Sequence, residues 1–126
     1  PVKTATEKVQ GFFTLDREAK ANFHMKLAQR RLDELELLVK RNRDIPQSLL
    51  GVINTETDGA IEILSRIKQV RKESIDRLMG LTSNQKKVLV ELREKVPSKV
   101  KWRLQEALKR SEHAHGRALL LKDMIP

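Results

Sequence analysis

The sequence predicts an all-α protein, an antiparallel bundle of three to four long amphipathic helices with a short N-terminal helix. Charged residues make up 34% of the 126 residues and aromatic residues only 3%, a balance that suits exposed helices and disfavours a β-sandwich. Apolar residues recur at intervals of three and four along most of the chain, which is the helical period. This length corresponds to about one domain, so we expect a single helical domain over residues 1–126.

The first expected element is a short helix over residues 1–13, capped near Thr4 or Thr6. Phe12 and Phe13 would let this segment pack as a lid across the main bundle. A glycine inside the segment weakens the helix and leaves a flexible tether as the alternative.

The second element, a long helix over residues 15–42, is the one around which the other helices are expected to pack. Thr14 and Asp16 offer side-chain oxygens that can cap its first turn. No glycine or proline interrupts it, and its apolar residues step by three and four along one face. This predicted buried stripe consists of Ala21, Met25, Ala28, Leu32, Leu35 and Val39.

Three further helices are expected, over residues 46–72, 74–96 and 98–122. Pro46 and Pro97 mark two of the starts, because proline suits a first helical turn and pushes the residue before it out of the helical region. The join between the second and third of the long helices stays open. The chain either breaks near Arg71, with Ser74 as a cap, or bends there and breaks near Gly80.

The last helix carries a second apolar stripe with many small residues, which permits close approach of a neighbouring helix. The stripe consists of Val100, Leu104, Ala107, Ser111, Ala114, Ala118 and Leu121. Trp102 lies just off this stripe and is interpreted as a packing anchor.

The chain is basic, with 26 basic and 17 acidic residues and a net charge of +9. Residues 97–126 carry seven bases and three acids, so their net charge of +4 is the largest of any segment. Such a field favours an anionic partner, so weak, salt-sensitive contact with a polyanion or an anionic membrane surface is expected, with a merely solubilising surface as the alternative. The bases scatter around the helix without base-reading groups, which argues against specific nucleic-acid recognition. The candidate polyanion contacts are Lys99, Lys101, Arg103, Lys109 and Arg110.

No metal site or cofactor is expected. Residues 54–59 have calcium-loop spacing, but Ser65 stands where the bidentate glutamate is needed, so this stretch is interpreted as exposed helix. His113 and His115 point roughly 200° apart on a helix and cannot share one ion. His24 has no titratable partner that the sequence identifies. The chain contains no cysteine, which excludes disulfides and thiolate sites.

No catalytic residue is expected either. The chain has no glycine-rich phosphate loop and no Gly-x-Ser-x-Gly elbow, and its carboxylates fall on charged helical faces rather than in a pocket. The sequence therefore predicts a non-enzymatic protein.

Residues 13–21 (FTLDREAKA) and 27–34 (LAQRRLDE) resemble the core of a bacterial family of helical domains of unknown function. The family pattern reads Thr-x-Asp-x-x-Ala-Lys-Ala-x-x-His-x-x-Leu-Ala-x-Arg-Arg-Leu-x-Glu. Residues 1–3 are similar to the end of its opening pattern, and residues 104–112 match its closing helix loosely. The motif positions in this chain are Asp16, Lys20, His24, Arg30, Arg31 and Glu34.

Members of this family typically follow a membrane-spanning helix and lie outside the cytoplasmic membrane. The resemblance therefore implies an extracytoplasmic interaction module, with a protein partner, from a membrane-anchored bacterial protein. The chain has no apolar run of about 18 residues, so the anchoring helix is expected in a longer full-length protein. Arg30, Arg31 and Glu34 are expected to flank the buried stripe and lock the long helix to its neighbours.

Two other functions remain open. The net charge allows a basic helical nucleic-acid-binding protein. Residues 81–85 (LTSNQ) resemble the Leu-Thr-x-x-Gln motif of periplasmic stress and metal-response helical hairpins, which suggests a weak metal-responsive periplasmic helper.

Overall fold

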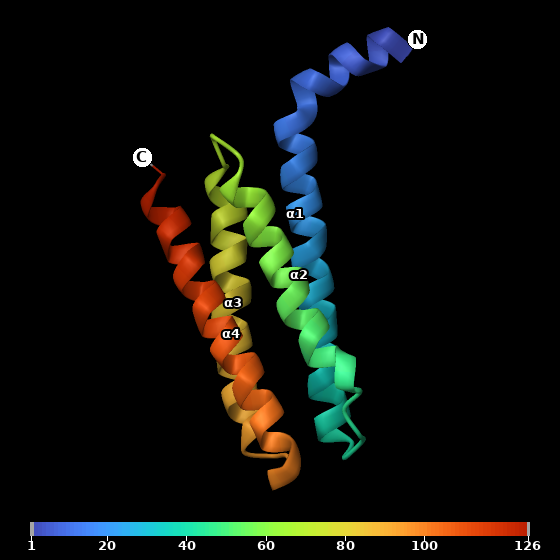
Figure 1. The fold of residues 1–126 in the computed structure, drawn as a ribbon, viewed down its shortest axis with the longest axis vertical. Coiled ribbons are helices and arrows are strands. Elements are labelled where there is room, and N and C mark those ends of the chain that lie inside the picture. Colours follow the sequence, from blue (N-terminus) through green and yellow to red (C-terminus); the bar gives the residue numbers. More distant parts are fainter. Residues whose placement is uncertain (1, 126) are drawn as a thin grey trace.

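Four α-helices make up the part of the chain that the structure describes. The computed structural model describes residues 2–125, with side chains described from 16 to 125, and contains no β-strand in that range. The prediction of an all-α bundle is thereby confirmed (Figure 1). The helices are α1 (Val2–Lys40), α2 (Gln47–Ser65), α3 (Lys72–Arg93) and α4 (Ser98–Asp123).

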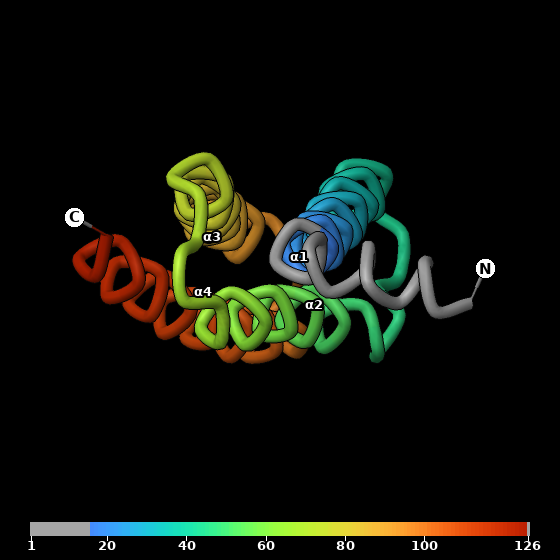
Figure 2. Tube along the Cα trace, turned by 90° about the horizontal axis from the view of Figure 1, so that it is seen from above, coloured from blue at the N-terminus to red at the C-terminus, as the bar shows by residue number. Residues whose placement is uncertain are grey.

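The helices are arranged as two antiparallel hairpins, α1–α2 and α3–α4, laid side by side. Seen along the bundle, α1 and α3 form one layer and α2 and α4 the other (Figure 2). The α1–α2 turn and the α3–α4 turn lie at the same end of the bundle, and the α2–α3 turn lies at the opposite end, near the C-terminal end of α4 (Figure 1). This topology decides which charged residues meet at each end.

The core follows the predicted stripes. All six predicted stripe residues of α1 are buried, and Leu32 and Leu35 are completely so. Along α4 the five central stripe residues are buried, while Val100 and Leu121 at its ends are half-buried. The apolar stripes therefore meet in the interior, as their helical spacing predicts.

The predicted start of the long helix is wrong. Helix α1 runs without interruption from Val2, so residues 2–13 do not form a separate helix and Asp16 lies inside α1 rather than at its cap. The sequence around residue 14 contains no helix breaker, and a single interior glycine costs only about 1 kcal/mol. The predicted packing of residues 1–13 as a lid lies outside the described side chains.

The helices predicted over residues 46–72 and 74–96 are also bounded differently, although the chain does break near Arg71, one of the two alternatives. Helix α2 ends at Ser65 rather than at residue 72, and α3 continues through Gly80 without a break. The half-buried side chains of Ile67 and Val70 pack onto the buried apolar residues at this end of the bundle, which include Leu64, Ile75 and Leu78. The segment between α2 and α3 is not helical where it makes these contacts. Ser74 is not the cap of α3, because Arg71 holds that position in an extended conformation.

A buried polar layer crosses the middle of the bundle. We use this name for Asn54 and Thr57 of α2, Gln85 of α3 and Ser111 of α4. Gln85 Nε2 donates to Thr57 Oγ1 at 2.8 Å, and Ser111 Oγ donates to Gln85 Oε1 at 3.0 Å. Asn54 Nδ2 donates to Ser111 Oγ at 3.4 Å. These hydrogen bonds therefore join α2, α3 and α4, and they give the buried polar side chains the partners that buried polar groups require.

The polar layer corrects the interpretation of residues 54–59 as exposed helix. Asn54 is 3% exposed and Thr57 is fully buried, because these polar residues face the polar side chains of α3 and α4. The layer also accounts for part of the Leu-Thr-x-x-Gln motif. Leu81 and Thr82 are buried with Gln85 inside the bundle, where Thr82 contacts His115 of α4 and Gln85 contacts Thr57 of α2.

Candidate anion-binding site at the paired turns

The end of the bundle that holds the α1–α2 and α3–α4 turns is strongly basic. Residues 40–46 and 93–103 contain eight bases and two acids, a net charge of +6 out of +9 for the whole chain. We call these two segments the basic end. Its bases are Lys40, Arg41, Arg43, Arg93, Lys95, Lys99, Lys101 and Arg103.

The α1–α2 turn is shaped by Asn42. This residue has a φ of 53°, in the left-handed region that asparagine tolerates better than most residues. Its N–H donates to Val39 O at 3.1 Å, and the N–H of Arg43 donates to Leu38 O at 2.9 Å. This pair of bonds closes the C-terminus of α1 and fixes the backbone of Arg43 against it.

The α3–α4 turn is short and ends at a proline. The N–H of Lys95 donates to Leu92 O at 2.9 Å, and Pro97 caps α4 with a φ of −60° and a ψ of 151°. Val100 N–H then donates to Pro97 O at 2.9 Å and begins the new helix. Lys95 lies within this turn, and Lys99 lies in the first turn of α4.

A hollow of about 160 Å³ lies between the two turns. Three bases line it, Arg43 from one turn and Lys95 and Lys99 from the other, together with the acid Asp44. No ion pair joins these three bases to an acid among the described side chains. The rest of the lining consists of Asn42 and five apolar residues, namely Val39, Ile45, Val96, Pro97 and Val100.

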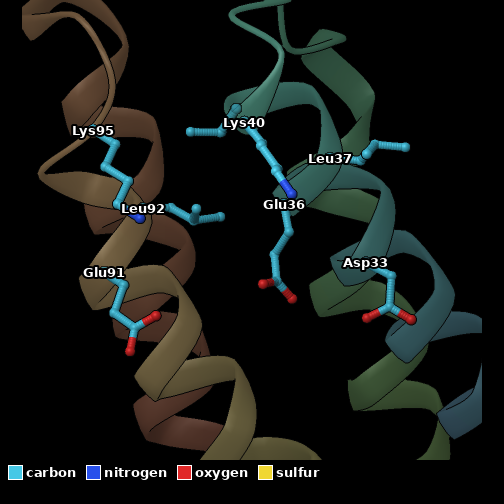
Figure 3. A pocket seen from close by; sticks show the side chains of 8 residues that line it. Asp33, Glu36, Leu37, Lys40, Glu91, Leu92 and Lys95 are labelled. Atoms are coloured by element: carbon cyan, nitrogen blue, oxygen red, sulfur yellow. The ribbon is translucent and has the colours of Figure 1, made fainter.

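An open groove of about 460 Å³ between α1 and α3 continues from this hollow, since Val39 and Lys95 line both. Figure 3 shows Glu36 reaching from α1 into the space that Leu92 enters from α3. The groove contains three acids, Asp33, Glu36 and Glu91, and two bases, Lys40 and Lys95. Its charge is therefore mixed, in contrast to the positive hollow.

The predicted polyanion contacts divide between the basic end and the rest of α4. Lys99 lines the hollow, and Lys101 lies 3.5 Å from Glu94 Oε2. Arg103 donates to the carbonyls of Ile45 and Pro46 at 3.4 and 3.2 Å, so it joins α4 to the α1–α2 turn.

The other two predicted contacts lie away from the basic end. Lys109 Nζ is 3.9 Å from Glu106 and Arg110 Nη2 is 3.1 Å from Asp58. Sequence reasoning missed the other five bases of the basic end, namely Lys40, Arg41, Arg43, Arg93 and Lys95. Counting charge at each expected end of an antiparallel bundle, instead of along the chain, would have found them.

Trp102 is not a packing anchor. Its side chain is 61% exposed, because two residues along a helix turn it roughly 200° from Val100 and Leu104 on the buried stripe. It stands between Lys101 and Arg103 and borders a shallow recess that also includes Leu50 and Arg110. The basic end therefore includes one exposed aromatic ring.

The family-motif residues have mostly structural contacts. His24 Nδ1 lies 2.5 Å from Glu56 Oε2, so His24 has an acidic partner on α2 that the sequence did not identify. Arg31 Nη1 pairs with Glu34 Oε2 at 3.1 Å within α1, so this pair does not lock α1 to a neighbour as predicted. The remaining motif residues, Asp16, Lys20 and Arg30, are exposed.

Sequence reasoning also missed the role of Glu18, which lies within the motif. This carboxylate is buried and accepts hydrogen bonds from Ser74 Oγ at 2.6 Å and from the backbone N–H of Arg71 at 3.3 Å. Arg71 Nε lies 3.4 Å from the same oxygen. Glu18 therefore connects α1 to the first turn of α3.

The remaining histidines occupy different environments. His113 is exposed, whereas His115 Nδ1 lies 2.7 Å from Thr82 Oγ1. Burial, and to a lesser extent the charge of Lys86, lowers the pKa of His115 from its ordinary 6.5. Among residues 16–125, no three histidine or acidic side chains cluster as metal ligands would. Within the same range, no helix is long and apolar enough to cross a bilayer.

Residues 1–99 match the family described as "Domain of unknown function (DUF5667)". The chain belongs to the DUF5667 family. The match covers α1 to α3 and the start of α4, and it confirms the resemblance to a family of unknown function. No curated protein matches this DUF5667 chain, and no solved structure matches it.

Proposed function

We propose that this DUF5667 domain is a non-enzymatic interaction module that contacts an anionic partner through its basic end. The observation that carries the proposal is the net charge of +6 on two short turn segments that lie together at one end of the bundle. Charges of one sign gathered within a Debye length of about 8–10 Å add their potentials. They attract a polyanion or an anionic surface more strongly than the same charges dispersed over the molecule.

The place of action that we propose is outside the cytoplasmic membrane, as the outward part of a membrane-anchored bacterial protein. The support is the similarity of residues 13–34 to the bacterial family pattern whose members follow a membrane-spanning helix. An anionic lipid surface or an acidic polymer outside the membrane is a partner with the required charge.

A non-catalytic role is supported by how the domain uses its least exposed acids. Glu18 accepts hydrogen bonds from residues at the start of α3, Glu56 pairs with His24, and Asp58 pairs with Arg110. Each of these carboxylates is occupied by a contact that holds two helices together, which accounts for them without a reaction.

The test compares charge reversal at the basic end with the same change elsewhere. Arg41→Glu/Lys99→Glu alters the basic end, and the matched control Lys20→Glu/Lys68→Glu alters exposed lysines outside it by the same net charge. Binding to phosphatidylglycerol vesicles, phosphatidylcholine vesicles and duplex DNA is measured by co-sedimentation and fluorescence polarisation between about 50 and 200 mM salt.

We expect the wild type and the control to bind the two anionic ligands at low salt and to release them as salt rises, because bound counterions are released on binding. The basic-end variant should bind neither. Equal losses in both variants would attribute binding to net charge alone, and absence of binding at the lowest salt would refute the proposal.

A nucleic-acid-binding role is the second candidate, and the exposed ring of Trp102 beside Lys101 and Arg103 favours it. Stacking of a base on an aromatic ring contributes about 1–3 kcal/mol. Single-stranded DNA should then quench the fluorescence of the single tryptophan, and Trp102→Ala should weaken binding to single strands but not to vesicles. Equal effects of this substitution on both ligands would argue against stacking.

A further inference from the structure

We infer that the hollow between the two turns is a binding site for a phosphate monoester group. This inference rests on the proposed function, because it assigns a ligand class to one part of the basic end. Three cationic side chains from two separate segments line the hollow, Arg43 from the α1–α2 turn, Lys95 from the α3–α4 turn and Lys99 from the start of α4. Such convergence from segments far apart in sequence distinguishes a site from a basic stretch of chain.

The contacts of these bases leave them available for a ligand. The ion pairs with an acid at this end of the bundle involve other bases, since Arg93 and Lys101 both approach Glu94. Arg103 is occupied by the carbonyls of the neighbouring turn. Arg43, Lys95 and Lys99 form no ion pair within the described side chains, so binding an anion there breaks no existing pair.

The charge of the hollow selects the class of anion. Three bases and the one acid, Asp44, give the lining a net charge of +2. A phosphate monoester carries about −1.5 to −2 at pH 7, which balances this charge, whereas a carboxylate or a phosphodiester carries a single negative charge. The guanidinium of Arg43 can also donate two parallel hydrogen bonds to phosphate oxygens, and the lysines add point charges.

The apolar part of the lining specifies what the phosphate is attached to. Val96 and Pro97 from one turn and Ile45 from the other form a surface without hydrogen-bonding side chains. A small carbon group next to the phosphate would cover this surface and gain hydrophobic contact. The groove between α1 and α3 does not fit the same ligand, because its three acids outnumber its two bases.

The test uses the whole domain and small probes at constant ionic strength. Inorganic phosphate, glycerol 3-phosphate, dimethyl phosphate and acetate are titrated while backbone amide shifts are followed by NMR. We expect saturable shifts at residues 43, 95 and 99 with inorganic phosphate, equal or tighter binding of glycerol 3-phosphate, and weaker binding of the two singly charged anions.

Two double variants separate the hollow from the general field of the basic end. Lys95→Gln/Lys99→Gln removes two lining charges and should weaken phosphate binding by about tenfold or more. The matched control Lys40→Gln/Lys101→Gln removes two charges from the same end outside the hollow and should change binding by less than about twofold. Circular dichroism confirms that both variants remain folded. Equal losses in the two variants would refute the inference.

Vesicles distinguish the source of the phosphate and separate this test from that of the proposed function. If phosphatidic acid vesicles, which expose a monoester, displace free phosphate, the ligand is a lipid headgroup; if they do not, the ligand is a soluble phosphate ester. Salt-sensitive vesicle binding without saturable phosphate shifts would overturn the phosphate site and leave the proposed function standing. Saturable phosphate shifts without binding to any anionic surface would overturn the proposed function alone.

Discussion

Replacing Gln85 with leucine removes the side chain that joins three helices through the polar layer. Gln85 is fully buried, donates to Thr57 Oγ1 and accepts from Ser111 Oγ. Thr57 keeps a partner after the change, because its hydroxyl donates to Ile53 O at 2.8 Å. Ser111 loses the acceptor of its hydroxyl and is itself completely buried.

The expected loss of stability follows from this difference. One orphaned buried donor costs about 1–3 kcal/mol, and leucine fills a volume similar to that of glutamine, so we expect Gln85→Leu to lower the free energy of unfolding by about 2 kcal/mol. For a chain of this length, that corresponds to a decrease in Tm of roughly 6–10 °C. Thermal unfolding followed by circular dichroism at 222 nm measures the change.

Two further variants make the result specific. Gln105→Leu makes the same replacement at an exposed position of α4 and should leave Tm within about 2 °C of the wild type. Gln85→Leu/Ser111→Ala removes the orphaned hydroxyl and should recover part of the loss. If Gln85→Leu melts like Gln105→Leu, the polar layer does not contribute to stability as argued.

Two other predictions concern the core and a histidine. Leu32→Asp places a charge at a fully buried position and should lower the free energy of unfolding by several kcal/mol, whereas Glu36→Ala on the exposed face should lower it little. If the two variants melt at the same temperature, the buried face of α1 is assigned wrongly. The pKa of His115 is lower in the folded protein than its ordinary 6.5, so between these two pKa values the unfolded chain binds more protons than the folded one. The stability that His115 contributes is therefore present above pH 6.5 and is lost as the pH falls from 6.5 through the folded pKa. The Tm of the wild type should therefore fall more than that of His115→Gln between pH 7.5 and 5.5, and parallel decreases would contradict the linkage.

The buried face of α1 could be predicted because it depends only on helical periodicity. Residues from Ala21 to Val39 repeat at three and four positions, and every helix with that pattern must cover its apolar stripe. The turns at Pro46 and Pro97 were predictable for a similarly local reason, since proline restricts the residue before it. Features that depend on residues close together in the sequence could therefore be predicted from it.

The features that the sequence did not reveal depend on helices that are distant in the chain. Nothing near Glu18 in the sequence marks it as buried, but the packing of α1 beside the α2–α3 turn makes it the acceptor for Arg71 and Ser74. The hollow likewise needs the two hairpins to be placed side by side before Arg43 and Lys95 can meet. Pairing of helices is a tertiary property, and a charge count along one segment contains no information about it.

The pairing of helices in hairpins also affects how the chain acquires its structure. Most contacts lie between α1 and α2 and between α3 and α4, which are neighbours in sequence, so the loops that must close are short. Such a low contact order favours fast folding, with each hairpin forming before the two dock. Two bonds of the polar layer, from Gln85 to Thr57 and from Asn54 to Ser111, cross between the hairpins. A docking displaced by one helical turn would leave these groups buried without partners, so they select a single register from several that apolar packing alone would tolerate.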